Sequence, residues 1–284
     1  MKAVLLLVML GSLFTGLAHA ESYPDAQRIV AVGGAVTEIV YALGEEARLV
    51  ARDSTSMHPP AAQALPDVGY VRRLSAEGVL SVGPDLIIGQ EDMGPPEATN
   101  LLQAAAIPVV VIPEGHTAET VAEKIRIVGT ALGQAEKGEV LAQQVEADIR
   151  SAAQAVQRFD EPPRVLFILS MQSGRVMAAG QDTSADAIIT LAGGVNAVSG
   201  YDGYKQLTDE AITNSGADVI LMMDREGDLA IHKEDVLAHP ALKVLPAARN
   251  GAIVRMDGLF LLGFSVRTGE AAQALAAALA ETRG

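Results

Sequence analysis

The 284-residue sequence has no cysteine and no tryptophan. Without cysteine there is no disulfide bond, no thiolate metal ligand and no cysteine nucleophile; we also expect no lipid anchor on an N-terminal thiol. Basic residues are scarce, because 21 Lys and Arg face 35 Asp and Glu, which gives a formal net charge of −14. So acidic a chain is a poor candidate for binding nucleic acids or anionic lipids.

Catalytic signatures are also lacking. There is no phosphate-binding loop with Gly-Lys-Ser/Thr and no His-Glu-x-x-His, and residues 263–267 (Gly-Phe-Ser-Val-Arg) lack the closing glycine of a nucleophile elbow. Four histidines follow residue 20, and no two lie within five positions of each other: His58, His116, His232 and His239. No local metal-binding pair is therefore predicted, although distant ligands can converge. We expect a binding protein; an exported enzyme on the same scaffold is the alternative from another class.

The first twenty residues are typical of a secretory signal. Lys2 is followed by an apolar run over 3–10, and Ala18-His19-Ala20 is a small-x-small cleavage site. The run is short for a bilayer span and no second long apolar stretch follows it. We expect cleavage after Ala20, a mature chain that begins at Glu21, and no direct membrane insertion; an uncleaved anchor is the alternative.

After this segment, apolar strand patterns alternate with helical ones. The run 28–32 ends in Gly33-Gly34 and leads into a helical stretch that Gly44 ends, and further buried strands are predicted at 85–89 and 107–112. Alternation of this kind favours parallel α/β layers.

An internal repeat lies within this pattern. Residues 75–88 match 208–221, so that Glu77 pairs with Glu210 and Asp85 with Asp218. Each copy is a short helix with a Ser/Thr-x-Glu start, followed by a glycine and a buried strand. Because the order of elements around both copies is the same, we predict a duplicated lobe.

A glycine-poor helical run separates the two copies. It extends from Glu136 to Phe159 before Pro162-Pro163, with apolar residues at helical spacing: Leu141, Val145, Ile149, Ala152, Val156 and Phe159. The predicted fold is therefore α/β, with two Rossmann-like lobes joined by one long backbone helix. The expected divisions are a signal peptide (1–20), an N-terminal lobe (21–135), a connecting helix (136–160) and a C-terminal lobe (161–284). One rigid helix would permit only limited hinge motion.

The turn after the first strand also suggests a dinucleotide site. Gly33-Gly34 opens a helix, and Asp53 follows nineteen residues later, where an acid would bind a ribose. The full Gly-x-Gly-x-x-Gly pattern is missing, however, which disfavours this reading.

The segment 67–77 carries the most informative chemistry. It places Tyr70, Arg72 and Arg73 in a loop with no acid from Val68 to Ala76. A phenolate oxygen suits Fe(III), and tyrosine is an axial ligand of ferric haem in some proteins. A nearby guanidinium favours the ionised phenol, whose ordinary pKa is about 10, and arginine can also bind a propionate. From the residues alone, a surface loop whose tyrosine packs against the helix explains this segment as well as a haem ligand does.

With this loop the sequence resembles a known family. The stretch Asp67-Val-Gly-Tyr-Val-Arg72, which leads into Leu74-Ser-Ala-Glu77, and the stretches 175–186 and 200–210 are similar to haem-specific members of the helical-backbone class of periplasmic binding proteins. The resemblance covers residues 24–282. It implies a non-enzymatic periplasmic carrier that captures ferric haem in a cleft between lobes and delivers it to an ABC permease.

The resemblance also assigns roles to residues. Tyr70 would coordinate the haem iron, and Arg72 and Arg73 would contact a propionate or the tyrosinate. Arg225 would reach the cleft from the second lobe and face the tyrosine. Some relatives bind a second, stacked haem through a histidine, where this chain has Ser170-Met-Gln-Ser173. That departure puts a two-haem mode in doubt.

The family docks onto its permease through one surface glutamate per lobe, and Glu77 and Glu210 occupy the matching positions. The alternative interpretation is that both are solvent-exposed acids in the first turn of a helix, where the helix dipole favours a negative charge. We expect a monomer in solution. A ferric-siderophore carrier of the same fold is the nearest alternative; a cobalamin carrier is disfavoured because five Tyr, five Phe and no Trp leave few rings to stack on a corrin.

Overall fold

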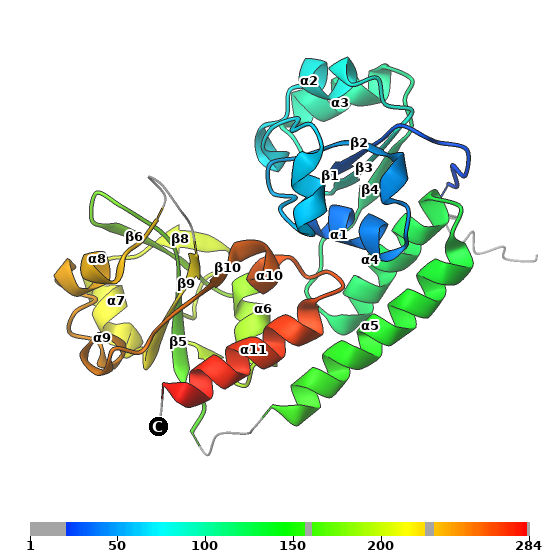
Figure 1. Ribbon diagram of the computed structural model, residues 1–284. Coiled ribbons are helices and arrows are strands. Elements are labelled where there is room, and N and C mark those ends of the chain that lie inside the picture. Colours follow the sequence, from blue (N-terminus) through cyan, green and yellow to red (C-terminus); the bar gives the residue numbers. More distant parts are fainter. Residues whose placement is uncertain (1–20, 157–160, 225–229, 283–284) are drawn as a thin grey trace, which may run out of the picture.

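The computed structural model describes residues 21–156, 161–224 and 230–282. The first lobe is built on a parallel sheet of strand order β2-β1-β3-β4 (Figure 1). Its strands and helices are β1 (Ile29–Val32), α1 (Gly34–Ala42), β2 (Leu49–Arg52), α2 (Ala76–Ser81), β3 (Leu86–Gln90), α3 (Pro96–Ala104), β4 (Val109–Ile112) and α4 (Ala118–Ala131). Short 3-10 turns lie at η1 (Glu46–Arg48), η2 (Pro60–Ala64) and η3 (Val71–Arg73).

The second lobe carries a sheet of order β10-β9-β5-β6-β8, with β7 also paired to β5. Its elements are β5 (Arg164–Gln172), β6 (Arg175–Ala179), α6 (Ser184–Leu191), β7 (Val195–Asn196), β8 (Tyr204–Gln206), α7 (Asp209–Ser215), β9 (Val219–Asp224), α8 (Lys233–Ala238), α9 (Pro246–Asn250), β10 (Ile253–Asp257), α10 (Gly258–Leu262) and α11 (Thr268–Glu281). The α/β fold class with two lobes and a long helix is confirmed.

The predicted parallel pairing holds in this second sheet for β5, β9 and β10, but β6 and β8 run antiparallel to their neighbours. Between β5 and β6 only Ser173 and Gly174 intervene, and their φ angles are 51° and 74°. Positive φ at both central residues is what a tight two-residue hairpin needs, so the chain reverses here and does not cross over through a helix.

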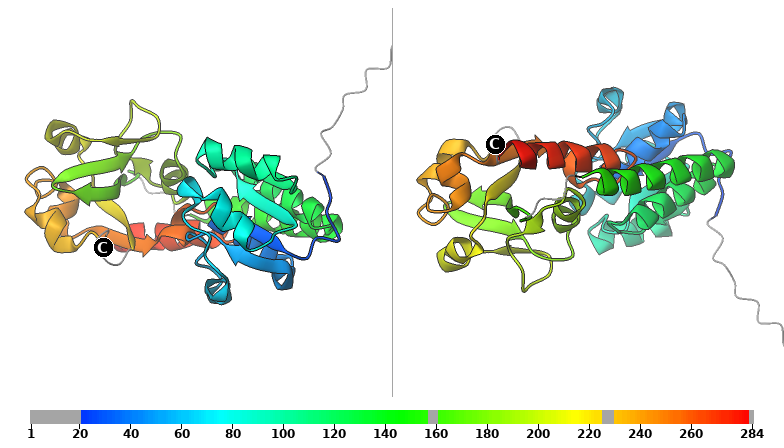
Figure 2. Two further views of the ribbon diagram at one scale, coloured as in Figure 1. Left: turned by 90° about the horizontal axis from the view of Figure 1, so that it is seen from above. Right: turned by 90° about the horizontal axis from the view of Figure 1, so that it is seen from below.

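The long helix α5 (Ala135–Ala155) packs against α4 on the back of the first lobe and reaches α11, which lies on the back of the second lobe (Figure 2). From the predicted apolar stripe, Val145, Ile149 and Ala152 are buried; Phe159 lies outside the described residues. The packing of α5 against α4 is very close, since a Cβ on Gly129 would lie 2.8 Å from the Cα of Gly138. Glycine on both helices permits this approach.

The repeat in the sequence is also a repeat in space. The carboxylate of Asp85 accepts hydrogen bonds from the Gln27 and Arg28 amides, each at 2.8 Å, and Asp218 accepts one from the Arg164 amide at 2.9 Å. Each of these arginines precedes or opens the first strand of its lobe and donates to carbonyls at the end of the repeated helix unit; Arg164, for example, donates to the Ser215 carbonyl at 2.9 Å. The same aspartate and arginine hydrogen bonds therefore join the first strand to the repeated unit in both lobes.

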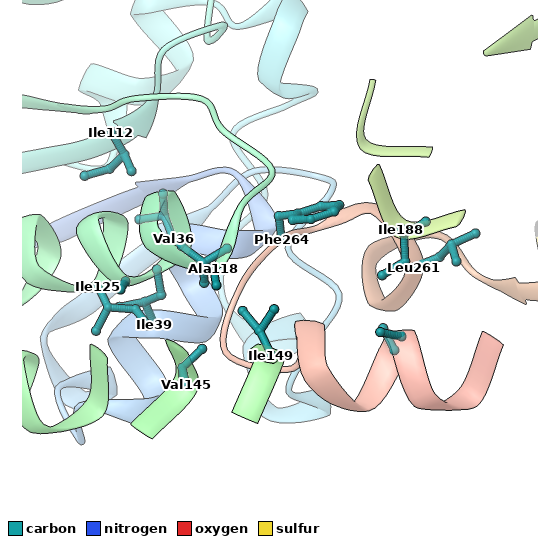
Figure 3. Close-up of a cluster of buried hydrophobic side chains, with 14 of the residues drawn as sticks. Val36, Ile39, Ile112, Ala118, Ile125, Val145, Ile149, Ile188, Leu261 and Phe264 are labelled. Atoms are coloured by element: carbon teal, nitrogen blue, oxygen red, sulfur yellow. The ribbon is translucent and has the colours of Figure 1, made fainter. Parts of the chain in front are cut away.

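Besides α5, a set of side-chain contacts from residues 264–267 holds the two lobes together. After α10 the chain returns to the first lobe, where the ring of Phe264 packs edge-on against His116 with centroids 5.0 Å apart. The Arg267 Nε and Nη2 both donate to the Oε1 of the buried Glu38 carboxylate, and the Ser265 hydroxyl donates to the Ala35 carbonyl at 3.5 Å. The main hydrophobic cluster continues through this junction, from Ile112 and Ile125 to Leu261 (Figure 3).

Candidate functional site

The loop of Tyr70 is anchored by its backbone to the end of β2. The Val68 amide donates to the Arg52 carbonyl at 3.0 Å, and the Ser54 amide donates to the Gly69 carbonyl at 2.9 Å. Gly69 has a φ of 104°, a conformation that glycine adopts without strain. The loop thus presents Tyr70 with its side chain 41 % exposed at the start of the η3 turn.

Tyr70 and Arg72 are in direct contact. The Arg72 Nη1 donates to the phenol oxygen at 3.0 Å, and its Nη2 forms an ion pair with Asp92. Partial burial of Arg72 acts to lower its pKa, but the hydrogen bond to Tyr70 and the charge of Asp92 outweigh it and raise the pKa. The guanidinium is therefore a permanent cation on the phenol oxygen.

The other predicted ligands are placed less fully. Arg73 is exposed in the same turn, and its amide donates to the Tyr70 carbonyl at 2.7 Å. Arg225 lies outside the described residues, directly after Asp224 at the end of β9. Asp224 itself pairs with Arg255 at 2.7 Å. Met171 is half-buried and packs against the core of the second lobe.

Two ionisable residues beside this loop, Lys124 and Glu114, were not identified from the sequence. Lys124 on α4 is 8 % exposed, and its ammonium donates to the Gly115 carbonyl at 2.8 Å. Burial lowers the pKa of Lys124, whereas burial and the charge of Asp92 raise the pKa of Glu114. Lys124 lies three residues after buried Val121 on the apolar face of its helix, which is the signal that marks it as buried.

Residues from both lobes line a cavity of about 420 Å³ at their junction. Its walls comprise Met57 and His58 from the first lobe and Asp257, Phe260, Arg267 and Glu270 from the second. Tyr201 packs inside the second lobe, with its hydroxyl 3.3 Å from the Ala178 carbonyl, and Tyr204 lies 36 % exposed on β8. Within the described ranges, no group of three His, Asp or Glu side chains is placed to hold a bare metal ion.

Asp53, the candidate ribose ligand, is fully occupied by its own loop. Its carboxylate accepts from the Gly33 amide at 2.9 Å, from the amide and hydroxyl of Thr55 at 2.9 and 2.6 Å, and from the Ser56 hydroxyl at 2.6 Å. The side chain is completely buried. Asp53 is therefore a structural residue that fixes the turn after β1, which argues against a dinucleotide site.

Glu77 and Glu210 occupy equivalent positions in the two lobes. Each is exposed in the first turn of a short helix, α2 or α7, behind an N-cap hydroxyl that accepts from a helix amide: Ser75 from Gly78 at 3.3 Å and Thr208 from Ala211 at 3.2 Å. Among the described residues, no helix is both long and apolar enough to cross a bilayer.

The model of the periplasmic binding protein family matches residues 29–258. The chain belongs to this family of binding proteins, which confirms the prediction that it is not an enzyme. The chain is similar to the periplasmic heme-binding protein BhuT in complex with two hemes, at 39 % identity and a TM-score of 0.85, over 90 % of this chain and 99 % of the other. The chain is also similar to the periplasmic heme-binding protein RhuT from Roseiflexus sp. RS-1 in apo form, at 38 % identity and a TM-score of 0.87. This match covers 91 % of this chain and 100 % of the other.

More distant relatives are found by sequence. The uncharacterized ABC transporter substrate-binding lipoprotein YvrC of Bacillus subtilis is 26 % identical over 74 % of this chain and 68 % of its own length. The vitamin B12-binding protein of Vibrio campbellii is 25 % identical over 75 % of this chain and 78 % of its own length. The relatives of higher identity are thus heme-binding proteins.

Proposed function

We propose that this protein captures ferric haem in the periplasm and delivers it to the membrane subunits of an ABC importer. The observation that carries this proposal is the exposed phenol of Tyr70, on a loop bonded through its backbone to the end of β2, with the Arg72 guanidinium on its oxygen. The similarity to BhuT and RhuT supports haem as the ligand.

In this proposal Tyr70 is the axial ligand of the haem iron. A phenolate is a hard anionic oxygen that suits Fe(III), and the cation of Arg72 stabilises its charge. Arg73 and Arg225 are the proposed partners of the propionates, because a guanidinium binds a carboxylate through two parallel hydrogen bonds. The cleft lies between lobes at 21–135 and 161–284, with 136–160 as the connecting segment.

A hemin titration of the purified chain tests the proposal. The wild-type protein is expected to give a tyrosinate-type ferric spectrum, and Tyr70→Phe is expected to remove it. Tyr23→Phe serves as the matched control, since Tyr23 lies near the N-terminus and bonds to Glu21. A protein that gives no spectral change beyond that of free hemin, or whose tyrosinate-type spectrum survives Tyr70→Phe, would refute the assignment.

The rival ligands are a ferric siderophore and cobalamin. The vitamin B12-binding relatives keep the second open, at lower identity than the heme-binding ones. In a siderophore carrier the arginines would grip an acidic chelate without an iron–phenolate bond. Retention of a ferric chelate by Tyr70→Phe, with no hemin binding by wild type, would favour this rival.

Glu77 and Glu210 are the proposed contacts to arginines of the permease, one from each lobe. We further propose that residues 1–20 are removed on export and that the carrier is a monomer. Reversing both charges (Glu77→Arg with Glu210→Arg) is expected to abolish haem uptake in cells and to leave the hemin spectrum unchanged. Uptake that persists in the double variant would disprove docking through these residues.

A further inference from the structure

Asp92 lies in the turn after β3 and is the carboxylate that meets Arg72. One of its oxygens pairs with the Arg72 Nη2, and the other accepts from the Gln90 Nε2 at 3.2 Å. The Asp92 side chain is 22 % exposed, while that of Arg72 is 58 % exposed. The acid is thus the more buried member of the pair and the arginine is the more exposed one.

Gln90 in turn is held by the turn after β1. A Cβ on Gly33 would lie only 2.0 Å from the Gln90 Oε1, so the amide occupies space that only a glycine leaves free. Gln90 is also the last residue of β3 and pairs in register with Ile112. A continuous set of contacts therefore runs from the sheet through Gln90 and Asp92 to Arg72.

An arginine as exposed as Arg72 has many rotamers open to it, and ordering it costs conformational entropy. The guanidinium is planar and rigid, so anchoring Nη2 on a fixed carboxylate also fixes the direction of Nη1. Nη1 is the nitrogen that donates to the phenol oxygen of Tyr70, at 3.0 Å. Without Asp92, most rotamers of Arg72 would leave that oxygen without its donor.

We propose that Asp92 is a positioning residue of the ligand site: it holds the Arg72 guanidinium on the phenol oxygen of Tyr70 and so sets how firmly that oxygen binds ferric haem. The inference rests on the proposed haem function and extends it to a residue that touches neither iron nor porphyrin. In this proposal Asp92 affects the bond between Tyr70 and iron through its ion pair with Arg72.

The experiment compares the haem complexes of Asp92→Asn and Glu91→Gln. Glu91→Gln is the matched control, because it removes one negative charge from the neighbouring position, where the carboxylate accepts only from the Glu114 amide at 3.1 Å among the described contacts. We measure the phenolate-to-iron charge-transfer band and the rate of haem loss to an excess of scavenger protein. Asp92→Asn is expected to shift the band and to speed haem loss about tenfold, which corresponds to about 1.4 kcal/mol; the control is expected to stay within about twofold.

Two further variants separate positioning from general damage to the fold. Arg72→Lys keeps the positive charge but cannot span both partners, so it is expected to resemble Asp92→Asn. In an Arg72→Ala background, Asp92→Asn is expected to have no further effect on haem loss, because the two residues act as one unit. A wild-type band and rate in Asp92→Asn, or additive effects in the double variant, would overturn the inference. Failure of wild type to bind hemin would instead overturn the proposed function.

Discussion

The ion pair between Glu38 and Arg267 should be the most stabilising charged contact between the lobes. The Glu38 side chain is 2 % exposed and that of Arg267 is 20 % exposed, so removal of the arginine leaves a buried carboxylate without its cation. Arg267 also stacks over the Phe260 ring, with its guanidinium carbon 4.9 Å from the centroid. We expect Arg267→Ala to destabilise the whole protein, because the contact joins α1 to the start of α11.

Breaking a buried pair by removing one partner costs about 3–5 kcal/mol. For a chain of this size, a loss of this kind corresponds to a fall in Tm on the order of 10 °C. Urea unfolding, followed by circular dichroism, measures the free energy directly. Arg255→Ala is the control: its pair with Asp224 is 34 % and 64 % exposed, and exposed pairs contribute about 1 kcal/mol or less.

The reasoning also predicts a rescue. Replacing both partners by apolar side chains (Glu38→Leu with Arg267→Met) leaves no unpaired charge, and such replacements of buried pairs are often neutral or stabilising. The double variant should therefore be more stable than Arg267→Ala alone. If Arg267→Ala loses no more than Arg255→Ala, or if the double variant is no better than the single one, the desolvated-charge argument is wrong.

Four further predictions concern single sites. Gly129→Ala should cost about 1–3 kcal/mol, because its methyl group would meet the α5 backbone at 2.8 Å, whereas Gly78→Ala, with its nearest neighbour at 3.6 Å, should gain about 0.5–1 kcal/mol of helix stability in urea melts. Burial, followed by the charge of Lys124, lowers the pKa of His116 below 6.5. The neutral imidazole therefore contributes its full share to the free energy of unfolding above pH 6.5, and this contribution is lost as the pH falls through the lowered pKa. His116→Gln should therefore narrow the gap between urea midpoints at about pH 5 and about pH 7.5; an unchanged gap would contradict the pKa direction. Asp53→Ala should cost at least about 2 kcal/mol, since it leaves several buried donors without an acceptor, and a neutral result would return this acid to the list of ligand candidates.

Most of the fold could be predicted because its signals are local. The runs that became β1, β3 and β9 are continuous apolar segments closed by glycine or polar residues, and the repeat around Glu77 and Glu210 marks the duplication directly. The antiparallel β5–β6 hairpin was not predicted, because its turn consists of only two residues, Ser173 and Gly174, between two apolar strands. The return of the chain to the first lobe depends on Phe264 and Arg267, whose partners lie far away in the sequence.

The site was predictable only in part, for the same reason. Tyr70 and Arg72 are two positions apart, so their contact follows from the local turn. Asp92 comes twenty residues later and reaches Arg72 only because β3 delivers it beside the loop. Lys124 and Glu114 join through tertiary packing as well. The role of each predicted site residue remains a prediction for the hemin experiments.

The hydrophobic cluster that crosses the junction has a consequence for how the molecule can be divided. Ile149 on α5 belongs to the same buried cluster as Ile125 in the first lobe and Leu275 in the second. A fragment that ends before α5 would expose the apolar side of α4 to water, and one that begins after it would do the same for α11. Neither half should be expressible as a soluble unit, and the intact chain should melt in one cooperative transition.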